Sequence, residues 1–304
     1  GEKPLTLEQI GLDAVYNAAY AAEVSRDFKR AVDLYGQYGK IETDHRKQDR
    51  AQWSIANIYK SSGDVNNMVE SLDRWRAKFG KDPGNEDDFV KSFADTAEAQ
   101  RKKGRTAQAK AAEKQTIDAW KQRGAVKNSA GAKLAAKYAL DQAEEFYEKT
   151  WTPFEIKAAA TSTNLNTAKK QIQDQQNKIQ DLRKKAEDQY IGLDQYGVVE
   201  ASMAAKVRFG DIQYDRAQKI SNIPIPKIIQ NNDAAISAFE TQRDAALKKD
   251  LDEAKLNWSE VADVAKKNGV SNKWSQHALE NLAREFPDQY KALRQELVQG
   301  TDAP

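Results

Sequence analysis

The feature that most constrains this chain is a pattern of small residues that recurs in the segments 15–38, 52–75 and 93–116. Seven positions are spaced alike in each segment, at offsets of 0, 1, 4, 8, 13, 17 and 20. They are Ala18, Ala19, Ala22, Arg26, Ala31, Tyr35 and Tyr38 in the first, Ile55, Ala56, Tyr59, Gly63, Met68, Leu72 and Trp75 in the second, and Thr96, Ala97, Gln100, Gly104, Ala109, Glu113 and Thr116 in the third. Small residues let two helices approach closely, and a glycine lets the chain turn between them. The pattern therefore predicts three repeated helix–turn–helix units.

Helical periodicity also dominates the rest of the chain, whereas the alternation typical of strands is rare. We therefore expect an all-α solenoid, with three helix pairs in residues 1–131 and an irregular helical region in residues 132–304. The second region is expected to hold a long central helix from about Phe154 to Tyr190, a helix pair at Asp233–Asp250 and Leu251–Lys267, and a capping helix after Asn272. A solenoid of this kind offers an extended surface to partners.

One segment of the second region does not fit a helix. Ile223-Pro224-Ile225-Pro226 alternates proline with isoleucine, and each proline fixes φ and lacks a backbone donor. The segment is therefore expected to be extended and to lie on the surface or between helices. Helical grooves accept strips of this type, so the segment is also a candidate to occlude the protein's own binding groove.

Composition excludes several function classes. The 304 residues carry 48 basic and 46 acidic side chains, and a net charge of +2 argues against a dedicated nucleic-acid binder. Cysteine is absent, which excludes disulfides, thiol nucleophiles and zinc–thiolate sites. No run of about 18 apolar residues exists, so no transmembrane segment is predicted.

Residues suited to catalysis are few. His45 and His277 are the only histidines, and neighbouring acidic pairs such as Glu144-Glu145 point in different directions on a helix. No glycine-rich phosphate loop follows a strand. We therefore predict no catalytic residue, no metal site and no cofactor, and expect a protein that is not an enzyme.

The three early segments resemble tetratricopeptide repeats, although Thr96, Gln100 and Glu113 are polar where such repeats are usually apolar. The order of elements from Val198 to Leu282 is similar to envelope tetratricopeptide-repeat proteins of myxobacteria and their relatives, including components of gliding-motility and spore-coat export machinery. The resemblance implies an assembly scaffold in the periplasm or at the outer membrane, with other envelope proteins or peptide segments as partners. Because the chain begins at Gly1, we expect a signal peptide or anchor to have been removed.

In tetratricopeptide repeats the first helix of each pair lines a concave groove, and transfer of those positions by offset predicts the binding residues. The predicted groove residues are Tyr16, Tyr20, Arg50, Trp53, Asn57, Lys60, Lys91 and Arg101. Aromatic anchors beside arginine suit a peptide with an acidic or C-terminal carboxylate group, which arginine binds as a fork. Packing of Tyr16 and Trp53 between helices is an equally favoured interpretation.

A second candidate surface is basic. Between Arg101 and Lys137 there are eleven basic residues and only two acidic ones, among them a basic stripe of Lys102, Lys103, Arg105 and Lys110. The stripe suggests an alternative function, the binding of anionic glycan or peptidoglycan, although such runs are more often solvated helix faces. A cytosolic signalling adaptor is a third possibility.

Overall fold

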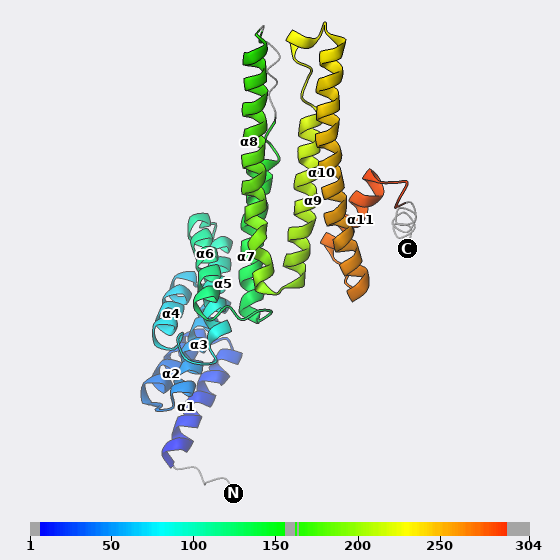
Figure 1. The fold of residues 1–304 in the computed structure, drawn as a ribbon. Coiled ribbons are helices and arrows are strands. Elements are labelled where there is room, and N and C mark those ends of the chain that lie inside the picture. Colours follow the sequence, from blue (N-terminus) through cyan, green and yellow to red (C-terminus); the bar gives the residue numbers. More distant parts are fainter. Residues whose placement is uncertain (1–6, 156–161, 163, 291–304) are drawn as a thin grey trace. The chain divides into compact units, whose positions relative to one another are not determined.

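The computed structural model describes residues 7–155, 162 and 164–290. Every regular element within these residues is a helix, which confirms the predicted all-α class (Figure 1). The chain forms two compact units, residues 1–138 and residues 139–304. The boundary falls inside helix α7, whereas the sequence predicted a boundary after residue 131.

The first unit consists of successive helix hairpins. Its helices are α1 (Leu7–Val24), α2 (Phe28–Ile41), α3 (His45–Ser62), α4 (Val65–Lys78), α5 (Glu86–Lys102), α6 (Thr106–Gln122) and the first half of α7 (Ala130–Phe146). Asp27, Asp44 and Asp64 cap α2, α3 and α4, because each carboxylate accepts a hydrogen bond from a backbone N–H of the first turn.

The repeated positions have the structural roles that their spacing predicts. Gly63 and Gly104 end the first helix of their hairpins with φ of +74° and +72°. Arg26 occupies the equivalent position of the first hairpin and also has a positive φ, +61°, which is unfavourable for a residue with a side chain. Ala31 and Ala97 are completely buried where the paired helices approach each other.

The three polar residues of the third hairpin are also buried, as the repeat pattern requires. The Thr96 hydroxyl donates to the carbonyl of Ser92 over 2.9 Å, and Arg101 donates to the Glu113 carboxylate. Each side chain therefore finds a local partner for a polar group that burial would otherwise leave unpaired.

The first helices of the hairpins lie next to one another and form a layer, called here the first-helix layer. Lys47 of α3 pairs with Asp13 of α1 at 3.9 Å, and Lys60 of α3 pairs with Asp95 of α5 at 2.7 Å. The Tyr138 hydroxyl of α7 donates to the carbonyl of Ala94 in α5 over 3.3 Å. This layered stack of hairpins is the arrangement expected of a tetratricopeptide-like solenoid.

The second unit is dominated by three long helices. Its elements are the end of α7, a π-helical turn at Tyr147–Trp151, α8 (Leu165–Ile191), a 3₁₀ turn at Gly192–Tyr196, α9 (Val199–Ser221), a 3₁₀ turn at Lys227–Ile229, α10 (Asp233–Asn268) and α11 (Lys273–Glu285). A core that includes Trp258, Val207 and Leu282 joins α9, α10 and α11. The predicted capping helix is confirmed, since Asn272 and Ser275 form a capping box at the start of α11.

Two predictions about helix ends need correction or restriction. The predicted break between Asp250 and Leu251 is wrong, because α10 runs through both residues without interruption. Asp250 is fully buried and bonded to Arg216 of α9, so it lies in a helix interior and not in a turn. The central helix α8 begins at Leu165, and most of the predicted first part, residues 156–161 and 163, lies outside the described residues.

The Ile223–Pro226 segment lies outside any helix and precedes the short 3₁₀ turn that leads into α10. Ile223 and Pro226 are buried against helices of the second unit. These two residues thereby line part of the space between α8, α9 and α10.

Candidate functional site

The structure brings three of the predicted groove residues together between α3 and α5. The buried carboxylate of Asp95 accepts hydrogen bonds from Lys60 Nζ over 2.7 Å and from Lys91 Nζ over 2.6 Å. Lys91 Nζ also lies 5.1 Å from the centre of the Trp53 ring, a cation–π distance. Trp53 and the two lysines therefore form one ordered patch on the first-helix layer.

The indole of Trp53 packs against the second helix of its own hairpin. Its ring meets that of buried Trp75 edge-on, with centroids 4.6 Å apart, and Trp75 Nε1 donates to Asp49. The other oxygen of Asp49 accepts from Asn85 over 2.8 Å. Trp53 is half-buried, so part of its ring packs and part is available to a ligand.

Arg50 and Asn57 are close to Trp53 on the same side of α3, because residues three and four apart are neighbours on a helix. Arg50 is exposed, and its guanidinium has no ion pair or hydrogen bond among the described residues. Asn57 is half-buried. Since Asp95 already neutralises one charge of Lys60 and Lys91, Arg50 is the cation of this patch that is best placed to meet an anion.

The remaining predicted groove residues have different surroundings. Tyr16 packs edge-on against Tyr35 and Tyr38 at 5.4 and 5.1 Å, which makes it a packing residue within the first hairpin. Tyr20 is 58% exposed. Arg101 reaches Glu113 of α6, so it is tied to its own hairpin.

Acidic groups around this patch adjust its charge. Burial raises the pKa of Asp88 above its usual range, Lys91 opposes that shift, and Asp49 adds to it. A hydrogen bond from Lys102 lowers the pKa of Glu98. The patch therefore combines cations with carboxylates and is not a uniformly basic surface.

The four residues of the basic stripe are all exposed. Lys102 pairs with Glu98 one turn earlier in α5 at 2.9 Å, and Arg105 donates to Asn66 of α4 over 2.8 Å. Lys103 lies at the end of α5, and Lys110 lies on α6. Since Lys102 and Arg105 are engaged within the chain, the stripe is less open to a polyanion than the sequence alone suggests.

The second unit contains a polar cluster that sequence reasoning missed, called here the Asp211 cluster. Its centre is the buried Asp211 carboxylate of α9, which accepts hydrogen bonds from Trp258 Nε1 at 3.0 Å, Asn281 Nδ2 at 3.0 Å and Arg208 Nη1 at 2.7 Å. His277 Nε2 lies 3.1 Å from both oxygens. These partners fix the position of the Asp211 carboxylate, and the cluster joins α9, α10 and α11.

Arg208 extends the Asp211 cluster toward α7 and α8. It also donates to both oxygens of Glu144, and Tyr190 donates to the same carboxylate over 2.7 Å. Burial alone would lower the pKa of Arg208, but the bonds to Glu144 and the charge of Asp211 raise it overall. Arg208 is therefore a permanent cation between two carboxylates, and removal of either carboxylate would leave its buried charge less compensated.

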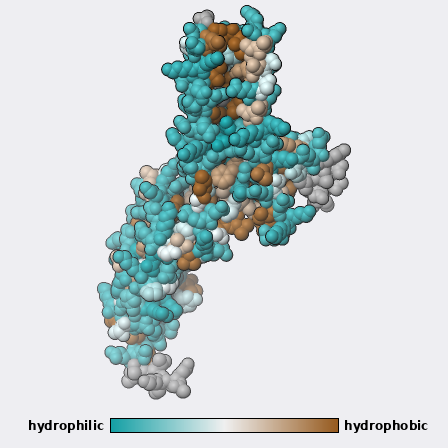
Figure 2. All heavy atoms as spheres, viewed as in Figure 1, coloured by the Kyte–Doolittle hydropathy of each residue, from teal (hydrophilic) through white to brown (hydrophobic). Residues whose placement is uncertain are grey.

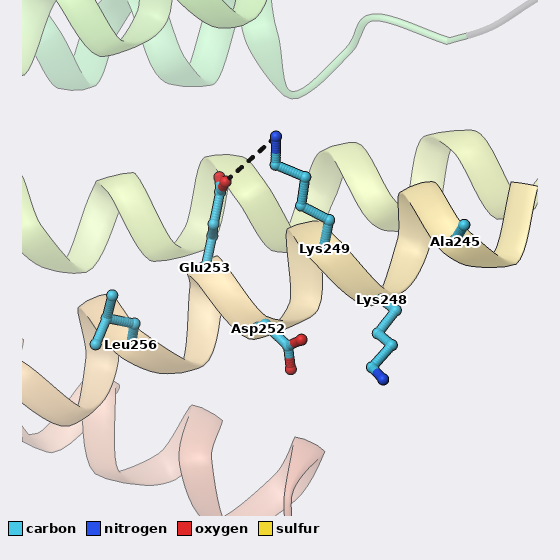
Figure 3. A pocket seen from close by; sticks show the side chains of 6 residues that line it. All are labelled: Ala245, Lys248, Lys249, Asp252, Glu253 and Leu256. Atoms are coloured by element: carbon cyan, nitrogen blue, oxygen red, sulfur yellow. Dashed lines mark ion pairs between the residues drawn. The ribbon is translucent and has the colours of Figure 1, made fainter.

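A hollow of about 430 Å³ lies along α10, and its six lining residues all belong to that one helix (Figure 3). Lys249 pairs with Glu253 across it at 4.0 Å, while Lys248 and Asp252 point away from that pair (Figure 3). Its polar groups do not converge on one point, so this hollow is not a candidate site.

No group of three or more histidine, cysteine, aspartate or glutamate residues in the described part of the chain is placed to hold a metal ion. No helix of the described residues is long and apolar enough to cross a membrane.

Comparison with known proteins places the chain beside one described repeat protein. It is similar in structure to a tetratricopeptide-repeat protein from Bacteroides fragilis, with 14% sequence identity, 93% of this chain and 98% of that chain covered, and a TM-score of 0.49. A likeness at this level has no bearing on function. No family model and no curated protein matches the sequence.

Proposed function

We propose that this protein is a non-catalytic scaffold that binds a peptide segment of a partner protein on its first-helix layer. The observation that carries the proposal is the patch between α3 and α5, where half-buried Trp53 is fixed by Trp75 and Lys91 beside the unpaired cation Arg50. An ordered aromatic anchor beside an available arginine is typical of residues that dominate binding energy in protein interfaces.

The chemistry of the patch favours a ligand with a carboxylate group. Arginine presents a planar fork that matches a carboxylate, and Arg50 has no partner within the described part of the chain that would compete. An extended peptide laid against α3 would place an apolar side chain on Trp53 and its terminal or side-chain carboxylate on Arg50. Lys60 and Lys91 contribute through their positive charge while they remain bonded to Asp95.

The setting of this activity is a further part of the proposal. The resemblance to envelope repeat proteins supports a role in the periplasm or at the outer membrane, as a component of a motility or export complex. The partners would then be other envelope proteins or their peptide segments.

Selection from a library of peptides with free C-termini tests the binding proposal, followed by calorimetric titration of enriched peptides against the full chain. We expect Arg50→Ala to weaken binding about tenfold or more, because a hydrogen bond to a charged group contributes about 1.5–3 kcal/mol. Conversion of the critical peptide carboxylate to an amide should cause a similar loss in the wild type and little further loss in Arg50→Ala.

Arg74→Ala is the matched control, because Arg74 is an exposed arginine of α4 that pairs with Glu70 of the same helix. It should leave peptide affinity unchanged. Peptides that bind Arg50→Ala as tightly as the wild type would overturn the proposed site. Salt-sensitive retention on heparin that survives Arg50→Ala but is lost in Lys103→Gln would favour the glycan-binding alternative instead.

A further inference from the structure

The second unit contains a cavity of about 940 Å³ between α8, α9, the segment 223–232 and the first half of α10, called here the α8–α10 cavity. Figure 2 shows hydrophobic side chains gathered at the end of this unit where Figure 1 places the start of α8 and the start of α10. The volume lies at the upper end of the range of about 300–1,000 Å³ that small-molecule sites occupy.

The wall of the cavity is largely apolar and elongated. Thirteen of its 22 lining residues are apolar, including Ile172 and Ile179 of α8, Ile223 and Ile229 of the connecting segment, and Phe239 of α10. The lining residues of α8 extend from Leu165 to Gln180, which at 1.5 Å per residue is a length of roughly 22 Å. A long apolar wall of this form suits an alkyl chain.

The charged residues in the described lining of the cavity are all basic. Lys169, Arg216 and Arg243 line the cavity, and no acidic residue of the described part of the chain does, although the whole chain has almost equal numbers of basic and acidic residues. The other six lining residues are asparagines and glutamines. The lining therefore favours an anion over a cation or a neutral polar group.

The two lining arginines are mostly buried, and each has a donor without a partner among the described residues. Arg216 and Arg243 are only 19% and 23% exposed, and the Nε of each is buried without a hydrogen-bond partner. Arg216 is bonded through Nη1 to Asp250, whereas the nearest carboxylate to Arg243 is that of exposed Asp244, 3.6 Å from Nε. Of the two arginines, Arg243 is thus the less neutralised, and a buried unpaired donor is costly unless a ligand satisfies it.

We propose that the α8–α10 cavity binds a free long-chain carboxylate, such as a fatty-acid anion. The alkyl chain lies along the isoleucine wall, and the carboxylate accepts hydrogen bonds from the guanidinium of Arg243. Arg216 adds positive charge while it remains bonded to Asp250. The site is independent of the peptide-binding patch of the first unit.

Titration of the full chain with cis-parinarate, a fluorescent long-chain carboxylate, tests the proposal. We expect saturable binding at one site, competition by palmitate, and at least tenfold weaker competition by hexadecanol, which has the same chain but no charge. Arg243→Gln should weaken parinarate binding about tenfold or more, as expected for loss of a charge-assisted hydrogen bond. This variant should fold, because the polar contacts of Arg243 with the described residues are a 3.6 Å pair with Asp244 and a cation–π contact of 5.9 Å with Phe239.

Two further variants separate head-group recognition from chain burial. Lys248→Gln removes one charge from an exposed position of α10 that does not line the cavity, and should leave the affinity unchanged. Ala238→Trp fills the cavity without a change of charge and should reduce the affinity for parinarate and hexadecanol alike.

Several outcomes would overturn the proposal. Equal competition by hexadecanol and palmitate, or unchanged parinarate affinity in Arg243→Gln, would show that the carboxylate is not recognised. Co-sedimentation with anionic phosphatidylglycerol vesicles without binding of monomeric parinarate would indicate a membrane surface as the ligand. Exclusion of parinarate from a dimer detected by light scattering would show that a second copy covers the face.

Discussion

Substitution of Gly210 by alanine should destabilise the second unit, although glycine to alanine within a helix normally has the opposite effect. Gly210 lies in the interior of α9, where a Cβ atom would come 2.5 Å from Nε1 and 2.6 Å from Cδ1 of Trp258. Real Cβ atoms do not approach other atoms below 3.0 Å, so the indole would have to move. Trp258 is completely buried and bonded through Nε1 to Asp211, which leaves it little freedom.

The expected change in the free energy of unfolding is the sum of three contributions. Alanine has a helix propensity about 1 kcal/mol better than that of glycine, which favours the variant. Overpacking of a core costs about 1–3 kcal/mol, and loss of the hydrogen bond from Trp258 to the charged Asp211 costs about 1.5–3 kcal/mol. The net destabilisation of Gly210→Ala is therefore expected between about 1.5 and 5 kcal/mol.

Urea denaturation followed by circular dichroism, together with hydrogen exchange in α9 and α10, measures this effect on the full chain. Gly36→Ala in α2 is the matched control, because nothing lies within 4 Å of its added Cβ, and it should gain about 0.5–1 kcal/mol. In a Trp258→Phe background the Gly210→Ala change should cost much less, because the five-membered ring that meets the Cβ is gone. A Gly210→Ala variant as stable as the wild type would refute the reasoning.

Two more predictions concern the first unit. Arg26→Gly should raise its stability by about 1 kcal/mol, measured by urea denaturation, because Arg26 has a positive φ of 61° at the position that Gly63 and Gly104 occupy in the other hairpins. The backbone hydrogen bond from Asp44, with further bonds from Tyr38 and Thr43, lowers the pKa of buried Glu42 below its ordinary value of 4.5 despite the opposing effect of burial. Because the folded pKa is the lower one, the ionised Glu42 stabilises the fold above about pH 4.5 and this stabilisation is lost as pH falls through the folded pKa. Glu42→Gln should therefore cost about 1.5–3 kcal/mol at pH 7 and much less at pH 3, and an equal cost at both values would contradict this account.

The hairpins of the first unit were predictable because the partners of each contact are close in sequence. Ala31 packs within its own hairpin, and the offset from Gly63 to Met68 sets the turn and the next helix. Even the polar residues Thr96 and Glu113 take up the buried positions that the spacing assigns, since a neighbouring carbonyl or arginine satisfies them. Regular spacing therefore predicts the backbone course where every unit repeats the same local contacts.

The second unit was less predictable because its decisive contacts join distant residues. Asp211 meets His277 and Asn281, which are 66 and 70 residues away, and no spacing rule marks such pairs. The sequence predicted a helix end at Asp250, because local spacing does not reveal its partner Arg216, which lies 34 residues earlier in α9. A charged residue between two helix-forming stretches predicts a turn. The prediction fails where the residue is buried in an ion pair with another element, as Asp250 is.

The difference between local and distant contacts also explains how much of the candidate sites could be predicted. The offsets placed Trp53, Lys60 and Lys91 on neighbouring helices, but they did not reveal that Asp95 bonds both lysines. Arg50 is therefore the cation of the patch that has no partner among the residues that the structure describes. Tyr16 shows the limit of transfer by offset, because its ring packs on Tyr35 and Tyr38 of its own hairpin.

The two proposed sites depend on arginines whose surroundings differ in a way that experiment can use. Arg50 is exposed, so its interaction with a carboxylate is screened by salt, whereas Arg243 is mostly buried and is screened much less. Peptide binding at Arg50 should therefore weaken as salt rises from 50 to 500 mM, while carboxylate binding in the α8–α10 cavity should change little. Because the arginines belong to different units, Arg243→Gln should leave peptide affinity intact and Arg50→Ala should leave parinarate affinity intact. A loss of both affinities in either variant would mean that the two sites are coupled or that the variant is misfolded, and hydrogen exchange of the unaltered unit distinguishes these cases.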